Sequence, residues 1–182
     1  MAAYFTARRK FDSASEQWES YLEFSKIPGV IEIVGLDSTL CPLILEEFDD
    51  EDLEFFSEDC GCGAFTNLEY LLKRIGGVDR CNVLAVIREP SEHIEHLMEP
   101  GFSFAGYELL EELTGVSALS NCGGFPKAFS NDELNELGLI PDFVSAREVQ
   151  RLLTKKYPTE PHAETTLYAI WRLDEYAPIE RS

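Results

Sequence analysis

Positive charge is scarce in this chain, which has 15 Lys and Arg residues against 34 Asp and Glu residues and a formal net charge of −19. Proteins that bind nucleic acid present a basic surface to the phosphate backbone, so this imbalance argues against such a ligand. A negative field of this size accelerates encounters with a positively charged protein surface. The composition therefore favours a basic protein as partner and predicts no nucleic-acid binding.

Long apolar runs are also lacking. No stretch approaches the roughly 18 apolar residues of a membrane-spanning helix, and the opening residues lack the apolar centre of a secretory signal. These absences predict a cytoplasmic protein that does not contact a membrane. An odd number of cysteines agrees with a reducing compartment, because one thiol would stay unpaired where disulfides form. The five are Cys41, Cys60, Cys62, Cys81 and Cys122.

The strongest sequence signatures of nucleotide and metal sites are missing. Gly61-x-Gly63 is followed by Thr66 where a dinucleotide-binding loop requires a third glycine, and no Gly-Lys-Ser or Gly-Lys-Thr occurs. His93-x-x-His96 has neither the four-residue spacing nor the intervening Glu of the helical zinc proteases. We therefore expect no cofactor, and we interpret the two histidines as exposed loop residues.

Composition and periodicity predict a globular fold. Hydrophobic residues make up 45% and aromatic residues 12% of the 182 positions, which suits one domain. We expect residues 1–182 to form that single domain, with a loose C-terminal tail from about residue 176. Helical periodicity and capping-box patterns predict helices over 14–26, 66–75, 130–137 and 141–156.

Extended segments lie between these helices. The signals are a β-branched run at 30–34, a nearly continuous apolar run at 81–87, the two arms of a hairpin within 102–129 and an alternating run at 166–173. Residues 40–45 form a possible edge piece, because Pro42 cannot donate to a sheet. The pattern predicts an α+β fold with about four helices packed on a mostly antiparallel sheet of about five strands. The alternative is an α/β fold with a partly parallel sheet.

The most unusual stretch lies between Glu46 and Asp59, where nine of fourteen residues are acidic and aromatic residues are interleaved. One interpretation is a short helix or loop whose aromatic side chains pack inward while the carboxylates face water. The other is an acidic patch that binds a basic surface. The predicted partner-binding residues are Glu46, Glu47, Asp49, Asp50, Glu51, Asp52, Glu54, Glu58 and Asp59.

Cysteines offer two alternative sites. Cys60, Cys62 and Cys81 could supply thiolates to zinc, although the spacing matches no common zinc motif. Cys122 precedes a Gly-Gly pair at the end of a predicted strand, and His162 could activate its thiol. Asn121 or Glu164 would then orient the imidazole, and the glycine amides could hold an oxyanion.

These features favour a small acidic cytoplasmic binding protein, of the inhibitor or immunity type, that neutralises a basic protein partner. The main alternative is a cysteine-dependent enzyme that uses Cys122 and His162. A second alternative is a metal-binding protein that uses Cys60, Cys62 and Cys81. No sequence motif in the chain decides among the three.

Overall fold

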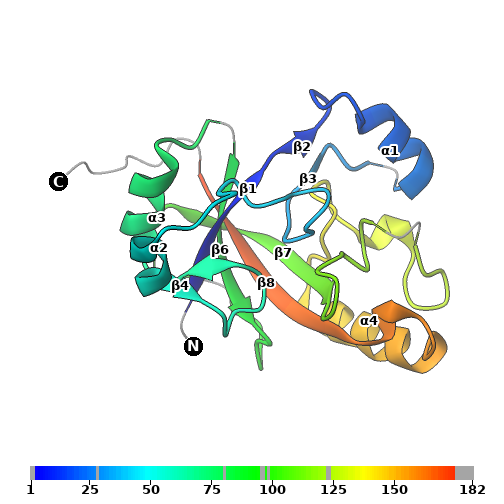
Figure 1. Cartoon of the computed structure of the whole chain (residues 1–182). Coiled ribbons are helices and arrows are strands. Elements are labelled where there is room, and N and C mark those ends of the chain that lie inside the picture. Colours follow the sequence, from blue (N-terminus) through cyan, green and yellow to red (C-terminus); the bar gives the residue numbers. More distant parts are fainter. Residues whose placement is uncertain are drawn as a thin grey trace.

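A six-stranded antiparallel sheet forms the centre of this computed structural model (Figure 1). The structure describes residues 3–27, 29–79, 81–94, 97, 99–121 and 124–174. The strand order is β4-β5-β1-β6-β8-β7, and a separate two-stranded ribbon pairs β2 with β3. The strands are β1 (Tyr4–Arg9), β2 (Phe11–Asp12), β3 (Glu32–Ile33), β4 (Phe56–Ser57), β5 (Ala64–Phe65), β6 (Cys81–Arg88), β7 (Phe102–Glu111) and β8 (Thr165–Leu173).

Four α-helices accompany the sheet in the described part of the chain. In Figure 1 α2 and α3 lie together toward one edge of the sheet, at the left, and α4 lies toward the other edge, at the lower right. The contacts agree, since α3 packs against β1 and α4 packs against β7 and β8. The helices are α1 (Trp18–Ser25), α2 (Asp50–Phe55), α3 (Leu68–Ile75) and α4 (Phe143–Lys156), with 3-10 turns η1 (Asn131–Glu133) and η2 (Pro161–Ala163).

The predicted α+β class is confirmed, but the large sheet has six strands instead of about five. Each pair of neighbouring strands in it runs antiparallel, so the α/β alternative with a partly parallel sheet is wrong for the described residues. None of the helices in the described ranges has the length and apolar content that a bilayer span needs. The C-terminal tail predicted from about residue 176 lies outside those ranges.

The central strand β6 matches its prediction. Every residue from Cys81 to Ile87 is buried, because β6 lies between β1 and β8 and both faces of the sheet are covered. Side chains alternate between two cores along a strand. Val83, Ala85 and Ile87 belong to the larger core, and Leu84 and Val86 belong to the smaller one.

Strand β1 was not predicted, although it lies beside β6 and pairs with it from Tyr4↔Val86 to Arg9↔Cys81. The reason is Arg8, a charged residue that is only 3% exposed. Its guanidinium donates hydrogen bonds to three buried backbone carbonyls, those of Leu36, Cys41 and Cys62. Burial of a cation at this position is possible only because those carbonyls replace water.

The predicted hairpin within 102–129 is wrong in its second arm. The first arm is β7, but it pairs along its length with β8. The following residues make an isolated bridge, Leu110↔Ser117, and then a turn. The backbone N–H of Ser117 donates to the buried carboxylate of Asp37 at 2.7 Å, so this chain segment is held by a side chain and does not extend the sheet.

Local capping explains where the helices begin. α4 starts after Asp142, whose carboxylate accepts the N–H of Ser145, and it runs as predicted. α3 is capped by Asn67 instead of Thr66. The capping box of Ser130 and Glu133 is present, yet it supports one 3-10 turn and not the predicted helix. The predicted helix at 14–26 is observed only as α1, and residues 40–45 form an isolated bridge instead of an edge strand.

Candidate functional site

The acidic segment 46–59 lies on the surface around α2 and β4. Its helix begins with a capping box, in which the carboxylate of Asp49 accepts the N–H of Asp52 and the carboxylate of Asp52 accepts the N–H of Asp49. Asp50 and Glu51 occupy the first turn, where negative charge interacts favourably with the helix dipole. The cluster of carboxylates therefore helps to form α2 instead of breaking it.

Eight of the nine predicted partner-binding residues are exposed. We call these eight residues, together with Leu53, the acidic surface. Leu53 is 63% exposed and stands among the carboxylates on α2. The eight acidic members are Glu46, Glu47, Asp49, Asp50, Glu51, Glu54, Glu58 and Asp59.

Asp52 is the exception, because its side chain is fully buried. Its carboxylate accepts hydrogen bonds from the Tyr70 hydroxyl at 2.8 Å and from Arg74 Nε at 3.0 Å. Burial alone would raise the pKa of Asp52, but the hydrogen bonds from the Asp49 amide, Arg74 and Tyr70 outweigh burial and lower it. Asp52 therefore ties α2 to α3 and does not contribute to the surface, contrary to its predicted role.

Aromatic packing supports the same segment from below. The Phe48 ring stands 4.9 Å from the Phe56 ring and 6.1 Å from the Phe65 ring, between centroids. The Phe55 ring stacks on Tyr70 at 4.4 Å. These contacts show that the aromatic side chains pack against the sheet and α3, although Phe48 remains 38% exposed, while most of the carboxylates are exposed. The exposed carboxylates therefore have a fixed backbone beneath them.

Three arginines approach the acidic surface from neighbouring elements, and one of them, Arg88, donates to the Asp59 carbonyl at 3.3 Å. Arg9 on β1 forms an ion pair with Glu46, and Arg74 Nη2 lies 3.8 Å from Asp49 Oδ2. The segment itself contributes no Lys, Arg or His between residues 46 and 59. Exposed ion pairs of this kind contribute little to stability, and solvent and partner ions compete for their charges. The surface thus keeps a large excess of negative charge.

A second polar feature lies buried between β1, β7 and the loop 35–41. Leu36 N–H donates to Glu108 Oε2 at 2.6 Å, and the Asp37 carboxylate accepts N–H groups of Thr39, Leu40 and Ser117. Burial, and to a lesser degree the nearby Asp37, raises the pKa of Glu108 to about 7. This arrangement fixes the loop against the sheet, because each backbone amide has a carboxylate acceptor.

The three-cysteine metal site is not formed. Cys60 Sγ lies 2.9 Å from Cys62 Sγ, and both residues pack in the smaller core with Leu84. Cys81 lies on the other face of β6, in the larger core, because its side chain alternates with that of Asn82. The described residues contain no group of three His, Cys, Asp or Glu side chains arranged to hold a metal ion.

Of the Cys122 and His162 pair, only His162 lies within the described residues. Its Nδ1 is 3.9 Å from Glu111 Oε2, and its ring packs edge-on against Phe125 with centroids 5.1 Å apart. Asn121 does not orient it, since the Asn121 amide donates to Asp37 and Thr39 instead.

Glu164, His93 and His96 are the other residues that the sequence singled out. Glu164, the second predicted orienter of His162, is exposed. His93 Nδ1 lies 2.8 Å from the Tyr107 hydroxyl, and the His93 ring packs edge-on against Phe104. His96 lies outside the described residues.

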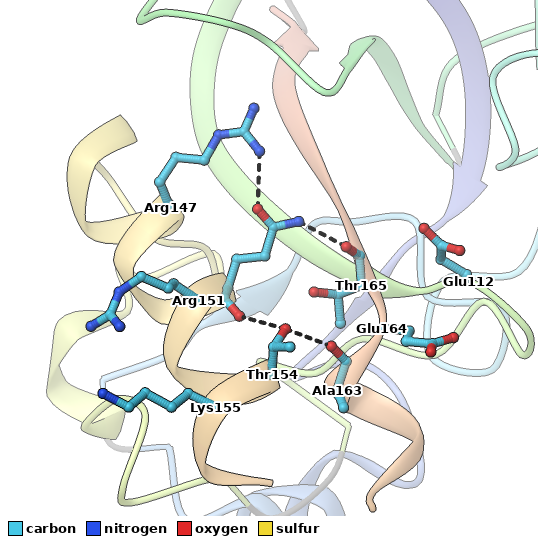
Figure 2. A pocket seen from close by; sticks show the side chains of 9 residues that line it. Glu112, Arg147, Arg151, Thr154, Lys155, Ala163, Glu164 and Thr165 are labelled. Atoms are coloured by element: carbon cyan, nitrogen blue, oxygen red, sulfur yellow. Dashed lines mark hydrogen bonds between the residues drawn. The ribbon is translucent and has the colours of Figure 1, made fainter. Parts of the chain in front are cut away.

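Sequence reasoning missed an open groove between α4 and the start of β8, which Figure 2 shows. Its α4 wall carries Arg147, Arg151 and Lys155, spaced by four residues so that they share one helical face. Gln150 Nε2 donates to the Thr165 carbonyl at 2.7 Å and Gln150 Oε1 accepts from Arg147, which closes part of the floor. The opposite wall carries Glu112 and Glu164, so the groove has no single charge sign.

Three polar features in the described part of the chain could serve a function: the acidic surface, the buried cluster around Arg8 and Glu108, and the α4 groove. Of these three, only the acidic surface is both exposed and of one charge sign; a smaller group of exposed carboxylates, Glu16, Glu19 and Glu23, lies on or beside α1. The buried cluster has a structural part, because Arg8 and Glu108 both bond to the backbone of Leu36. No family model, no curated protein and no solved structure matches the chain.

Proposed function

We propose that the protein is a small acidic binding protein, of the inhibitor or immunity type, that neutralises a basic protein by docking through the acidic surface. The observation that carries this proposal is the exposure of eight carboxylates on one short segment. Opposite charge across an interface favours encounter and fixes orientation. The formal net charge of the whole chain, −19, also attracts a positively charged partner.

Rigidity of the segment favours binding. Asp52 connects α2 to Tyr70 and Arg74 on α3, and Phe48 packs on the sheet residue Phe65. A surface that is already ordered loses less conformational entropy on association than a mobile acidic tail. The carboxylates can therefore present a fixed pattern of charge to a partner.

Leu53 supplies an apolar contact in the middle of this charge. Its side chain is 63% exposed, more than Phe48, which is 38% exposed and packs on Phe65. Interfaces commonly combine a central apolar anchor with a charged rim. A basic partner with an apolar pocket among its cations fits this surface.

The experiment compares two variants that remove the same charge from different places. One variant neutralises three of the eight carboxylates of the acidic surface, by Asp50→Asn, Glu51→Gln and Glu54→Gln. In the control, Glu16→Gln, Glu19→Gln and Glu23→Gln neutralise three exposed carboxylates on or beside α1. The immobilised proteins are exposed to an extract of the source cells at low salt, and each captured protein is then purified and titrated against all three baits.

We expect to capture a basic protein that binds the wild type and the α1 control equally well. It should bind the acidic-surface variant at least tenfold more weakly. Its affinity should also fall steeply as salt rises, and the wild type should inhibit its activity. Equal binding to both variants would place the interface elsewhere. Capture of no basic protein at low salt would refute the proposal.

A further inference from the structure

Cys60 and Cys62 form a close pair of buried thiols in the loop that joins β4 to β5. Their Sγ atoms are 2.9 Å apart, and the two residues are 0% and 8% exposed. They are separated by a single glycine, Gly61, whose φ of +71° is in the left-handed region. This backbone turn lets the two side chains point to the same side.

The sheet holds the backbone on either side of this pair. Side chains from three strands donate to four of the five carbonyls from Asp59 to Gly63, which leaves the thiols in a fixed position. A Cβ on Gly61 would lie 3.2 Å from the Tyr168 hydroxyl, so the tight approach of loop and sheet depends on glycine. The donors and acceptors are Arg88 to Asp59, Tyr168 to Cys60, Arg8 to Cys62 and Thr6 to Gly63.

The two thiols differ electrostatically. A hydrogen bond from the Cys62 thiol lowers the pKa of Cys60, and the nearby Arg8 and Arg88 guanidinium groups lower it further. The same hydrogen bond, together with burial, raises the pKa of Cys62. Cys60 is therefore the thiol that ionises first, and Cys62 stabilises its thiolate by donating a proton in the hydrogen bond.

We propose that Cys60 and Cys62 are a redox-active pair, which hydrogen peroxide closes into an intrachain disulfide and a dithiol reductant reopens. The inference is independent of the proposed docking function. It assigns a modification site to the loop that directly follows Glu58 and Asp59 of the acidic surface.

The chemistry balances in two steps. The Cys60 thiolate attacks one oxygen of the peroxide, the O–O bond breaks, and the departing hydroxide takes a proton to give water and a sulfenic acid on Cys60. Cys62, on losing its proton, then attacks the Cys60 sulfur. The S–O bond breaks, and the second hydroxide leaves as water with that proton. The two sulfur atoms together lose two electrons, and one peroxide molecule accepts them.

Geometry favours this pair over the other described thiols. A disulfide has an S–S bond of about 2.05 Å, so Cys60 and Cys62 need to approach by less than about 1 Å. Cys41 instead donates its thiol hydrogen to the Ile33 carbonyl at 3.3 Å, and burial raises its pKa. Cys81 lies on the opposite face of the sheet. Burial of the pair also selects a small oxidant such as peroxide.

In the test, the folded wild-type chain is treated with hydrogen peroxide and the oxidant is then removed. The protein is unfolded, and its remaining thiols are alkylated. Mass spectrometry of the peptide that contains Cys60, Gly61 and Cys62 should show the loss of both alkylation events and of two hydrogen atoms. Dithiothreitol added before alkylation should restore both events. No variant is needed for this result, so a folding defect cannot obscure it.

Two variants sharpen the assignment. Cys81→Ala removes a buried thiol elsewhere and should leave the disulfide unchanged. Cys62→Ala removes the resolving thiol, so no disulfide should form and Cys60 should progress to sulfinic acid. Alkylation of both Cys60 and Cys62 after peroxide treatment of the wild type, or a disulfide from either of them to another cysteine, would overturn the proposal.

Discussion

Arg74 Nε lies 3.0 Å from Oδ1 of Asp52, a carboxylate with no exposed surface. The two residues belong to different helices, α3 and α2, and their contact is the main polar connection between them. Tyr70, one turn earlier on α3, donates to the same oxygen. This contact decides which part of the acidic segment is structural and which part faces solvent.

Replacement of Asp52 by Asn should destabilise the fold. The change removes the negative charge beside Arg74 and replaces one carboxylate oxygen with an NH₂ group. The Asp49 N–H, which donates to Oδ2 of Asp52, then faces another donor, and this costs about 1–3 kcal/mol of unfolding free energy. Urea denaturation measures the loss. Asp50→Asn, on the exposed side of the same helix, is the matched control and should change stability by less than about 0.5 kcal/mol. Equal effects from both substitutions would contradict the anchoring role of Asp52.

Glu108 should make stability fall as pH rises from weakly acidic to neutral values. Its pKa moves from an ordinary value of 4.5 to about 7 in the folded protein, mainly through burial. The folded state therefore keeps a proton that the unfolded chain releases. The unfolding free energy should decrease by up to about 3 kcal/mol as pH rises from 4.5 to about 7. Above about pH 7 Glu108 should cause no further decrease.

Glu108→Gln isolates this contribution, because glutamine keeps the shape of the side chain and has no proton to lose. The difference in unfolding free energy between wild type and variant should shift in favour of the variant between pH 4.5 and pH 7. Chemical denaturation at several pH values measures it. Parallel pH profiles for the two proteins would show that Glu108 does not titrate in this range.

Gly106→Ala should be more costly than Gly76→Ala. Both glycines have positive φ, so each substitution introduces backbone strain. At Gly106 a Cβ would also lie 2.7 Å from Leu139 Cβ and 3.0 Å from the Ile140 carbonyl oxygen, whereas at Gly76 nothing stands within 4 Å. Thermal denaturation should show an additional loss of about 1–3 kcal/mol at position 106.

Leu53→Ser should weaken partner binding without weakening the fold, if the acidic surface is the docking site. The side chain is 63% exposed, so its removal changes unfolding free energy by about 0.5 kcal/mol or less. If Leu53 fills an apolar pocket on the partner, its truncation should weaken binding about tenfold, which corresponds to about 1.4 kcal/mol. Leu113→Ser is the control, because Leu113 is 89% exposed on a different loop. Unchanged affinity in the Leu53 variant would remove this residue from the interface.

Local signals predicted several elements well. The apolar run at 81–87 became β6, and the region after Pro141 became α4, because strand and helix periodicities there agree with the burial that tertiary packing imposes. The alternation at 166–173 predicted β8 but suggested a sheet with one covered face. Tyr168 and Ile170 are in fact buried in the smaller core, since loops cover that face.

Other features were decided by contacts between distant residues. β1 was not predicted, because an arginine such as Arg8 normally faces solvent and does not indicate a buried strand. Its burial is favourable only because its guanidinium donates to the carbonyls of Leu36, Cys41 and Cys62. The second strand of the predicted hairpin does not form, because the Asp37 carboxylate, 80 positions away, accepts the Ser117 N–H. Such partners cannot be identified from local propensity, which carries no information on long-range pairing.

The sequence by itself determined the excess of negative charge, the concentration of carboxylates at residues 46–59 and the α+β class, because composition and periodicity are local properties. Only the tertiary structure decided that Asp52 is buried and does not belong to the acidic surface. It also decided that Cys60 contacts Cys62 while Cys81 lies in the other core, and that six strands form one sheet. Each of these depends on which residues meet across the folded chain, and burial then changes the chemistry of the groups that do.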